Sequence, residues 1–358
     1  MFSLKSFFGG SDAILGVDIG TTSIKVAEIV RGRERLKLTN YGILETHAYL
    51  ERFNEALQTS SLKIGEETTA DYLKLLLQRA GIRAKLAVAA VPAFLTFSTL
   101  IEVPAMSEGE IKKFMDFQGK RYIPLPLSAV SIDWMKVGEK TDSEGTVKYQ
   151  ILLVSIPNEQ IENYQRIFRS AGLRLTGIET EGMSLARALG AAAEEVTLIV
   201  DIGSRSTSFS IAAKGHLKFS GQTDFSGGSL TQIVASGLNI SQRRAEDLKK
   251  QRGLLGFGGE HELSTLMEPI LDVIMNEARR VITNFETNYE EKVKAVILSG
   301  GGANMAGLAD YWNKEFGLKV SKINPFSPIA YPDILSSIAK ETGPLLSVAI
   351  GLALKKFV

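Results

Sequence analysis

A short pattern that occurs twice constrains the fold of this chain more than any other feature of its sequence. It reads Leu-Gly-Val-Asp-Ile-Gly-Thr-Thr-Ser-Ile-Lys at residues 15–25 and Leu-Ile-Val-Asp-Ile-Gly-Ser-Arg-Ser-Thr at residues 198–207. Each copy joins an apolar run, an aspartate, a glycine and small hydroxyl residues, and this order predicts a strand, a tight turn and a second strand. Two such turns facing each other across a cleft would hold a phosphate chain and its metal ion from both sides.

The composition is that of an ordinary globular protein, and it argues against several function classes. The 358 residues suffice for two domains, with 44% hydrophobic and 23% charged residues. The net charge of +1 gives no support for nucleic-acid binding, and the absence of cysteine excludes disulfides and thiolate sites. The three histidines are scattered, which argues against structural zinc. Because no apolar run reaches the roughly 18 residues of a membrane span and no signal peptide is evident, we expect a cytoplasmic protein.

The first half of the chain contains a segment whose sequence pattern differs from that of the residues before it. Before it, the pattern predicts strands within residues 14–45 and at 85–91 and a helix at 68–80. Within residues 94–173 it predicts strands at 96–103, 131–137 and 148–157 and helices after Ser107 and at 159–171. Ser107 followed by Glu110 forms a capping box. We therefore expect a small α+β insertion of about 80 residues here.

The second half opens like the first and then becomes helical. Strands are expected within residues 196–225 and at 294–298, and helices at 230–236, 241–250, 263–289 and 343–355.

The first turn carries candidate phosphate ligands. Gly20, Thr21 and Thr22 offer backbone N–H groups and hydroxyls at close range. Lys25 lies seven residues after Asp18, so the next strand can return its amine to the phosphates. Asp18 is a candidate for holding Mg²⁺ through water. An Asp-stabilised hairpin turn without a ligand explains these residues equally well.

The second turn supplies the corresponding set. Asp201 corresponds to Asp18 as a second candidate for Mg²⁺, and the phosphate candidates are Gly203, Ser204, Thr207, Gly227 and Gly228. Gly227 and Gly228 let backbone approach from another side, although a simple hairpin turn explains them as well.

Glu181 is the third carboxylate of interest, 20 residues before Asp201. It is a candidate for orienting a hydrolytic water, and with Asp18 and Asp201 it forms the candidate catalytic set. The alternative is a carboxylate at a helix N-terminus that complements the helix dipole.

Candidate contacts to a base and sugar come later in the chain. Glu246 and Lys249 are three residues apart on one helix face, where Glu246 would accept from ribose hydroxyls and the Lys249 stem would lie against adenine. An exposed ion pair explains the same spacing. Gly300, Gly301 and Gly302 follow an apolar strand and permit close approach to a nucleotide, with Asn304 beside them.

In this order, the motifs resemble the five-motif signature of the actin-like ATPase superfamily. The resemblance implies an α/β fold with two lobes, built from duplicated ribonuclease-H-like domains, that binds ATP with Mg²⁺. The first lobe would comprise residues 1–93 and 174–195, and residues 94–173 would form its insert. The second lobe would comprise residues 196–225 and 294–358, and residues 226–293 would form its subdomain.

Within the superfamily, the insert resembles the PilM family of type IV pilus assembly proteins. The resemblance rests on Leu100–Ile111, on Gln118 with Tyr122–Leu127, on Ser131–Trp134 and on Ser170–Leu173 before Ile178-Glu179. It implies an ATP-binding scaffold at the cytoplasmic face of the inner membrane. The N-terminal tail of PilN would dock between the insert and the first lobe, and the scaffold would communicate with motor ATPases and the platform protein.

Two alternatives stay open at this point. One is a division protein like FtsA, although the chain stops at Val358 without that family's membrane-targeting helix. The other is a sugar-kinase-type phosphotransferase, for which Asp133 is the candidate catalytic residue. Arg205 and Ser206 replace the small acidic or glycine residues of actin, which puts fast hydrolysis in question. Whether the chain forms homo-oligomers also stays open.

Overall fold

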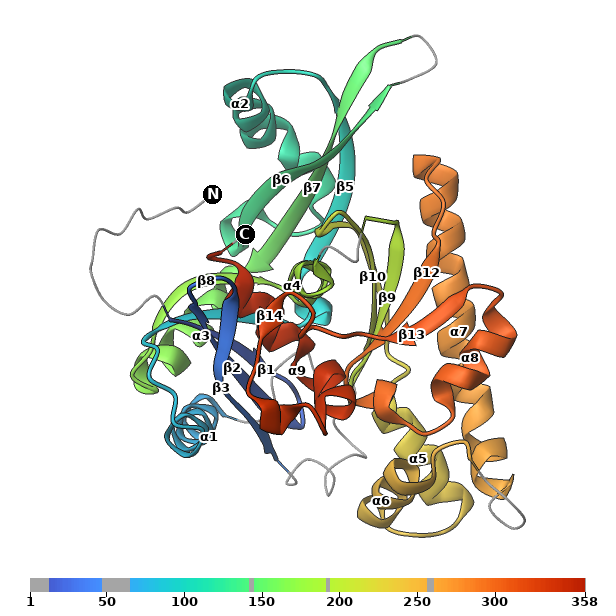
Figure 1. Ribbon diagram of the computed structural model, residues 1–358. Coiled ribbons are helices and arrows are strands. Elements are labelled where there is room, and N and C mark those ends of the chain that lie inside the picture. The colour runs from blue at the N-terminus through green and yellow to red at the C-terminus, as the bar shows by residue number, and fades with distance from the viewer. Residues whose placement is uncertain (1–12, 47–64, 142–144, 191–193, 256–260, 358) are drawn as a thin grey trace.

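A computed structural model describes residues 13–46, 65–141, 145–190, 194–255 and 261–357 (Figure 1). Within these ranges the strands form sheets of six, five and three strands. The sheet of six and the sheet of five lie beside each other, and the sheet of three extends away from the first (Figure 1). None of the described helices is both long and apolar enough to cross a membrane.

The first sheet has the order β14-β3-β2-β1-β4-β8. Its strands are β1 (Ile14–Ile19), β2 (Ser23–Arg31), β3 (Leu36–Glu45), β4 (Leu86–Val91), β8 (Arg174–Thr180) and β14 (Ile329–Ala330). The first three form an antiparallel meander, and β4 runs parallel to both β1 and β8. Because both of its faces are covered, β1 is buried along its whole length and can be uniformly apolar up to Asp18.

Four helices pack on the first sheet. They are α1 (Glu66–Arg79), α3 (Asn158–Ser170), α4 (Glu181–Ala188) and α9 (Ala339–Leu354). The strand that the pattern predicted at 85–91 and the helix at 68–80 are confirmed as β4 and α1.

The second sheet repeats the topology of the first. Its order is β11-β10-β9-β12-β13, with the strands β9 (Thr197–Ile202), β10 (Thr207–Ala213), β11 (His216–Thr223), β12 (Ala295–Ser299) and β13 (Lys319–Lys322). Again a three-stranded antiparallel meander is followed by two strands parallel to the first. Its helices are α5 (Gly227–Gly237), α6 (Gln242–Arg252), α7 (His261–Tyr289) and α8 (Leu308–Phe316). The duplicated sequence pattern therefore corresponds to a duplicated fold.

The third sheet forms the insert. It has the order β5-β7-β6, with β5 (Phe97–Pro104), β6 (Val130–Thr141) and β7 (Val147–Pro157), and α2 (Glu108–Gln118) covers it. Ile101, Ile111 and Leu153 belong to a hydrophobic cluster separate from those of the other sheets. The capping box at Ser107 and Glu110 is confirmed, with a Ser107 N–H to Glu110 Oε2 distance of 2.8 Å.

The insert also contacts the second sheet. The Lys218 ammonium on β11 lies 3.4 Å from Gln150 Oε1 on β7 and 2.8 Å from Glu291 Oε1. Gly138 on β6 leaves room for this contact, since a Cβ there would lie 2.5 Å from Gln150 Oε1. The insert is therefore connected to both halves of the molecule.

Two segments lie elsewhere than the expected lobe boundaries suggest. Helix α3 falls within the expected insert 94–173, but it packs against α1 and β8 of the first sheet. Residues 329–354 fall within the expected second lobe, but β14 pairs with β3, and α9 packs on β1, β2 and α4. The reason lies in α9, which is buried from Thr342 to Leu354 except at Leu345 and therefore packs between the sheet and another helix.

Candidate functional site

The two duplicated turns have the same local geometry. In the first, Gly20 N–H donates to Ser23 O at 2.9 Å, and in the second, Gly203 N–H donates to Ser206 O at 3.1 Å. Asp18 pairs across the strands with Lys25, and Asp201 pairs with Ser208. Each turn therefore fixes an aspartate at the last positions of a buried strand, as the sequence predicted.

The first turn contains an ion pair. Lys25 Nζ lies 2.9 Å from Asp18 Oδ2, and a Cβ on Gly20 would lie 3.6 Å from the same nitrogen. Burial acts to lower the pKa of Lys25, but Asp18, with weaker contributions from Asp201 and Glu181, outweighs it and raises the pKa. Lys25 thus remains a cation that interacts with carboxylates from both sheets.

Among the described residues, neither Asp201 nor Glu181 forms an ion pair, and both interact more weakly with Lys25 than Asp18 does. Burial raises the pKa of Asp201 to about 6, and a hydrogen bond from Ser299 acts in the opposite direction. Burial, together with Asp201 and Asp18, raises the pKa of Glu181 well above its ordinary value. Glu181 Oε2 accepts from Ala93 N–H at 3.3 Å, whereas Asp201 Oδ1 is buried without a hydrogen-bond partner.

These carboxylates fit a divalent cation that keeps bound water. The described residues hold no group of three His, Cys, Asp or Glu side chains close enough to ligate a metal ion directly. Asp18 and Asp201 are nevertheless near enough to interact, and Asp201 Oδ1 has a free acceptor site. Mg²⁺ commonly uses one or two carboxylates and several waters, so the residue set is suitable for it.

Helix α5 holds the second turn in place. Gly227 N–H donates to Gly203 O at 2.8 Å, and Gly228 N–H donates to Ser204 O at 3.0 Å. Ser226, the N-cap of α5, donates its hydroxyl to the same Ser204 O at 2.9 Å. Gly227 and Gly228 therefore begin a helix rather than forming a hairpin turn, and that helix N-terminus lies against the second turn.

The glycines after β12 lie against Asp201 from another side. Gly300 has a φ of 79°, and a Cβ there would lie 2.8 Å from Asp201 Oδ1. A Cβ on Gly302 would lie 2.4 Å from the Ile202 side chain, whereas Gly301 has space around it. Gly300 and Gly302 are thus required for close packing on the second turn.

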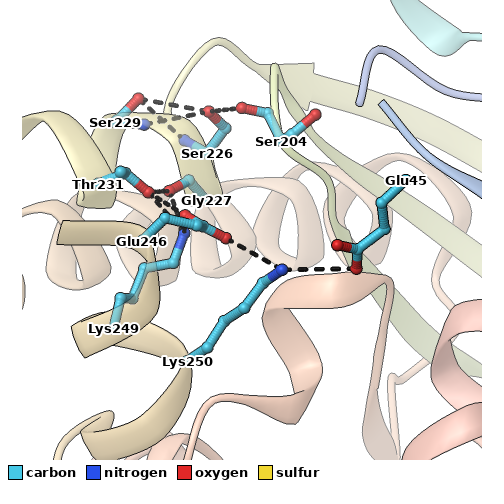
Figure 2. A network of polar contacts seen from close by, with 9 residues as sticks. All are labelled: Glu45, Ser204, Ser226, Gly227, Ser229, Thr231, Glu246, Lys249 and Lys250. Atoms are coloured by element: carbon cyan, nitrogen blue, oxygen red, sulfur yellow. Dashed lines mark hydrogen bonds and ion pairs between the residues drawn. The ribbon is translucent and has the colours of Figure 1, made fainter. Parts of the chain in front are cut away.

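Glu246 and Lys249 form a buried ion pair, not an exposed one (Figure 2). Lys249 Nζ lies 2.6 Å from Glu246 Oε2 and donates to Gly227 O and to Thr231 Oγ1, both at 2.7 Å. Burial lowers the pKa of Lys249, and Glu246 opposes that effect. The ammonium therefore holds the first turn of α5, and through it the second duplicated turn.

Lys250 connects the two halves of the molecule at the same place. Its ammonium lies 3.7 Å from Glu246 Oε1 and 3.5 Å from Glu45 Oε1 at the end of β3 (Figure 2). The network thus runs from α5 through α6 to the first sheet.

The structure brings most of the predicted residues together, but not all face the same space. Asp18, Lys25, Glu181 and Asp201 interact with one another, and Gly300 lies against Asp201. Thr207 is fully buried, and its hydroxyl donates to Phe225 O. Asn304 donates to Glu341 O and accepts from Lys322. The side chains of Thr207 and Asn304 are thus engaged with other parts of the fold.

Two residues of the site had no recognisable role in the sequence. Tyr164 on α3 is fully buried with its hydroxyl unpartnered, and burial raises its pKa, with Glu181 and Asp18 adding to the effect. Arg205 extends from the second turn, and its guanidinium lies over the Phe94 ring at 4.1 Å from the centroid. Only the departure of Arg205 from the actin pattern was a signal in the sequence.

The two repeated sheets with their matching turns define a protein of the actin-like, two-lobe α/β fold. The chain belongs to the family of type IV pilus assembly proteins PilM, whose family model matches residues 16–357. A solved PilM–PilN type IV pilus biogenesis complex contains a chain that is 24% identical, with a TM-score of 0.81, covering 96% of this chain and 98% of that one. The resemblance found in the sequence is therefore confirmed.

More distant relatives share the fold. EutJ from Carboxydothermus hydrogenoformans is 17% identical with a TM-score of 0.57, covering 96% of this chain and 89% of that one. MreB5 of Spiroplasma citri, solved with AMPPNP, is 15% identical with a TM-score of 0.55, covering 97% of this chain and 96% of that one. In sequence, the cell division protein FtsA of Enterococcus hirae is 23% identical, in an alignment that covers 87% of this chain and 78% of that protein.

Proposed function

We propose that this chain is an ATP-binding scaffold of the type IV pilus assembly platform. The observation that carries the proposal is the pair of matching turns, which fix Asp18 and Asp201 on two sheets near enough to interact. Phosphates would bind the backbone N–H groups at Gly20 and Gly203 and the amine of Lys25. Mg²⁺ would lie between the two aspartates through its waters. The relative MreB5, which has the same fold, was solved with an ATP analogue.

The proposed partner is the N-terminal cytoplasmic tail of PilN, docked between the insert and the first lobe. The support is the likeness to the PilM–PilN complex and the exposed apolar side chains of the insert. Phe117 is 84% exposed and Leu125 is 44% exposed, and Tyr122, Leu127 and Ile132 are also exposed. Such a group on one subdomain is typical of a partner-binding surface. Motor ATPases and the platform protein would be reached from the same position at the cytoplasmic face of the inner membrane.

Nucleotide binding is tested with Asp18→Ala, because its carboxylate partners Lys25 and faces Asp201. We expect the variant to lose at least tenfold in affinity for Mg·ATP by calorimetry, with an unchanged circular dichroism spectrum. The matched control is Asp133→Ala. Asp133 is exposed on β6 of the insert and accepts from Trp134 N–H. Asp133→Ala should therefore keep full ATP affinity, and it would abolish phosphoryl transfer only if the protein were a sugar kinase. Full ATP affinity in Asp18→Ala would exclude the proposed site.

Tail docking is tested with Phe117→Ser and Leu125→Ser. Removing an apolar anchor costs an interface about 1–3 kcal/mol, so we expect the affinity for a synthetic PilN-tail peptide to fall roughly 5- to 150-fold. Ile334→Ser is the matched control, because Ile334 is 82% exposed near β14, outside the insert. Equal peptide affinity in all four proteins would remove the exposed insert residues from the interface.

A further inference from the structure

Arg205 extends from a backbone that the fold holds rigidly. Gly203 O and Ser204 O on its N-terminal side accept hydrogen bonds from the first turn of α5, at 2.8 and 3.0 Å. Ser206 O on its other side closes the turn with Gly203 N–H at 3.1 Å. The residues on both sides of Arg205 are thus fixed by backbone hydrogen bonds, and its side chain extends from a defined position.

The guanidinium of Arg205 reaches from the second sheet to the first. It lies over Phe94, in the short 3-10 turn Ala93–Leu95 that follows β4. The neighbouring Ala93 N–H donates to Glu181 Oε2 at 3.3 Å, so the stacked pair lies beside the carboxylate cluster. Within the part of the chain that the structure describes, no carboxylate lies within ion-pair distance of Arg205. Among the described residues, the guanidinium thus contacts an aromatic face and has no counter-ion.

A cation–π contact is weaker than a charge-assisted hydrogen bond, so a stacked guanidinium can exchange the ring for an anion. The cation–π contact uses the face of the group, and the N–H donors point outward in its plane. These donors match two oxygens of one phosphate at once, which a lysine cannot do. This part of the molecule therefore holds carboxylates suited to a cation and, among the described residues, a guanidinium without an ion-pair partner, which is suited to an anion. A Mg·nucleotide complex supplies both charges.

We propose that Arg205 binds the terminal phosphate of a nucleoside triphosphate, exchanging the Phe94 ring for phosphate oxygens, and so distinguishes the triphosphate from the diphosphate. The inference rests on the proposed nucleotide site and adds a specificity-determining residue to it. It also gives the departure from the actin pattern at this position a role. Since Phe94 stands where the chain enters the insert, release of the ring occurs at the junction between nucleotide site and insert.

The test compares Mg·ATP and Mg·ADP affinity by calorimetry in the full chain. A hydrogen bond to a charged group is worth about 1.5–3 kcal/mol, so Arg205→Ala should weaken Mg·ATP binding roughly 10- to 100-fold. Mg·ADP binding should change less than about threefold. Arg205→Lys should fall between the parent protein and Arg205→Ala for Mg·ATP. Arg31→Ala is the control, since it removes another guanidinium stacked on a ring, that of Phe357, from β2.

Phe94→Leu tests the exchange itself. The ring competes with phosphate for the guanidinium, and a cation–π contact is worth about 0.5–1 kcal/mol, so the variant should bind Mg·ATP as tightly as the parent or up to about fivefold tighter. Weaker Mg·ATP binding with unchanged Mg·ADP binding would overturn the exchange. Equal losses for both nucleotides in Arg205→Ala, or none, would overturn the assignment. Failure of the parent protein to bind either nucleotide would instead reject the proposed function.

Discussion

At the scale of single residues, the site is dominated by negative charge removed from water. Three carboxylates interact there, and among the described residues Asp18 has an ion-pair partner, Lys25, whereas Glu181 and Asp201 have none. Asp201 is the most informative of them, because burial raises its pKa to about 6 and one of its oxygens has no partner. Ionising this group in the folded protein therefore costs free energy that a bound cation would return.

Asp201→Asn should change the pH dependence of stability. The pKa of Asp201 in the folded protein lies above that of an unfolded aspartate, so its ionisation destabilises the fold as pH rises from about 4 to about 6. Above that range we expect the variant to be more stable than the parent by about 1–3 kcal/mol, with no difference below pH of about 4. Urea denaturation of both proteins across this pH range measures the difference in their free energies of unfolding. Parallel pH profiles for the two proteins would contradict the prediction.

The chemistry-bearing residues were predictable where a local pattern encodes them. An aspartate and a glycine at the end of an apolar strand suffice to predict the turns at Asp18 and Asp201. The direction of a long side chain is not encoded locally. Lys249 therefore turned out to hold α5, and Arg205 to stack on a ring that is more than 100 residues away in the chain. Tyr164 reaches the site only through the packing of α3.

At the scale of elements, the start of α5 depends on one polar cluster. Thr231 Oγ1 lies 2.5 Å from Glu246 Oε2, 2.7 Å from Lys249 Nζ and 2.9 Å from Gly227 O. Burial acts to raise the pKa of Glu246, but Lys249 and Thr231 outweigh it, so the pKa is lowered. The cluster keeps two charges stable inside the protein by satisfying each of them.

Thr231→Val should destabilise this cluster with little change in shape. The hydroxyl is lost, and Glu246 and Lys249 each lose a buried partner, which costs about 1–3 kcal/mol. The free energy of unfolding from urea titration measures the loss. Thr231→Ser keeps the hydroxyl and should retain most of the stability. Equal stability of Thr231→Val and the parent protein would show that the cluster contributes nothing to α5.

Elements with a strong local pattern were predictable, and those that depend on distant partners were not. The meanders of both sheets, α2 with its capping box and α7 were expected and found. Strand β8 was not expected, because it contains Gly177 and Glu179. That glutamate is buried in contact with Arg187 and Lys355 from other elements. Helix α8 begins after Gly307 without a side-chain cap, and β14 has only two residues.

At the scale of the whole molecule, the two halves interlock through the last part of the chain. After β13 of the second sheet, β14 adds to the edge of the first sheet and α9 packs across its face. The approach is close enough to require glycine. A Cβ on Gly16 would lie 1.8 Å from Ala349 O, and one on Gly351 would lie 2.0 Å from Ser184 O.

Gly16→Ala should therefore separate α9 from β1. The added Cβ would meet backbone atoms, which cannot move aside as the end of a side chain can. We therefore expect the free energy of unfolding to fall by about 3 kcal/mol or more, at the upper end for overpacked cores. A thermal unfolding scan measures the loss. Gly109→Ala is the matched control, since nothing lies within 4 Å of its added Cβ in α2. A melting temperature of Gly16→Ala equal to that of the control would contradict this packing.

The return of α9 to β1 also governs how the protein is made. Residues 14–19 leave the ribosome early, and the helix that covers them is translated more than 300 residues later. Throughout that interval the nascent first lobe exposes an apolar sheet face in the crowded cell, where such surfaces aggregate or recruit chaperones. The first lobe to be synthesised is consequently the last to be completed.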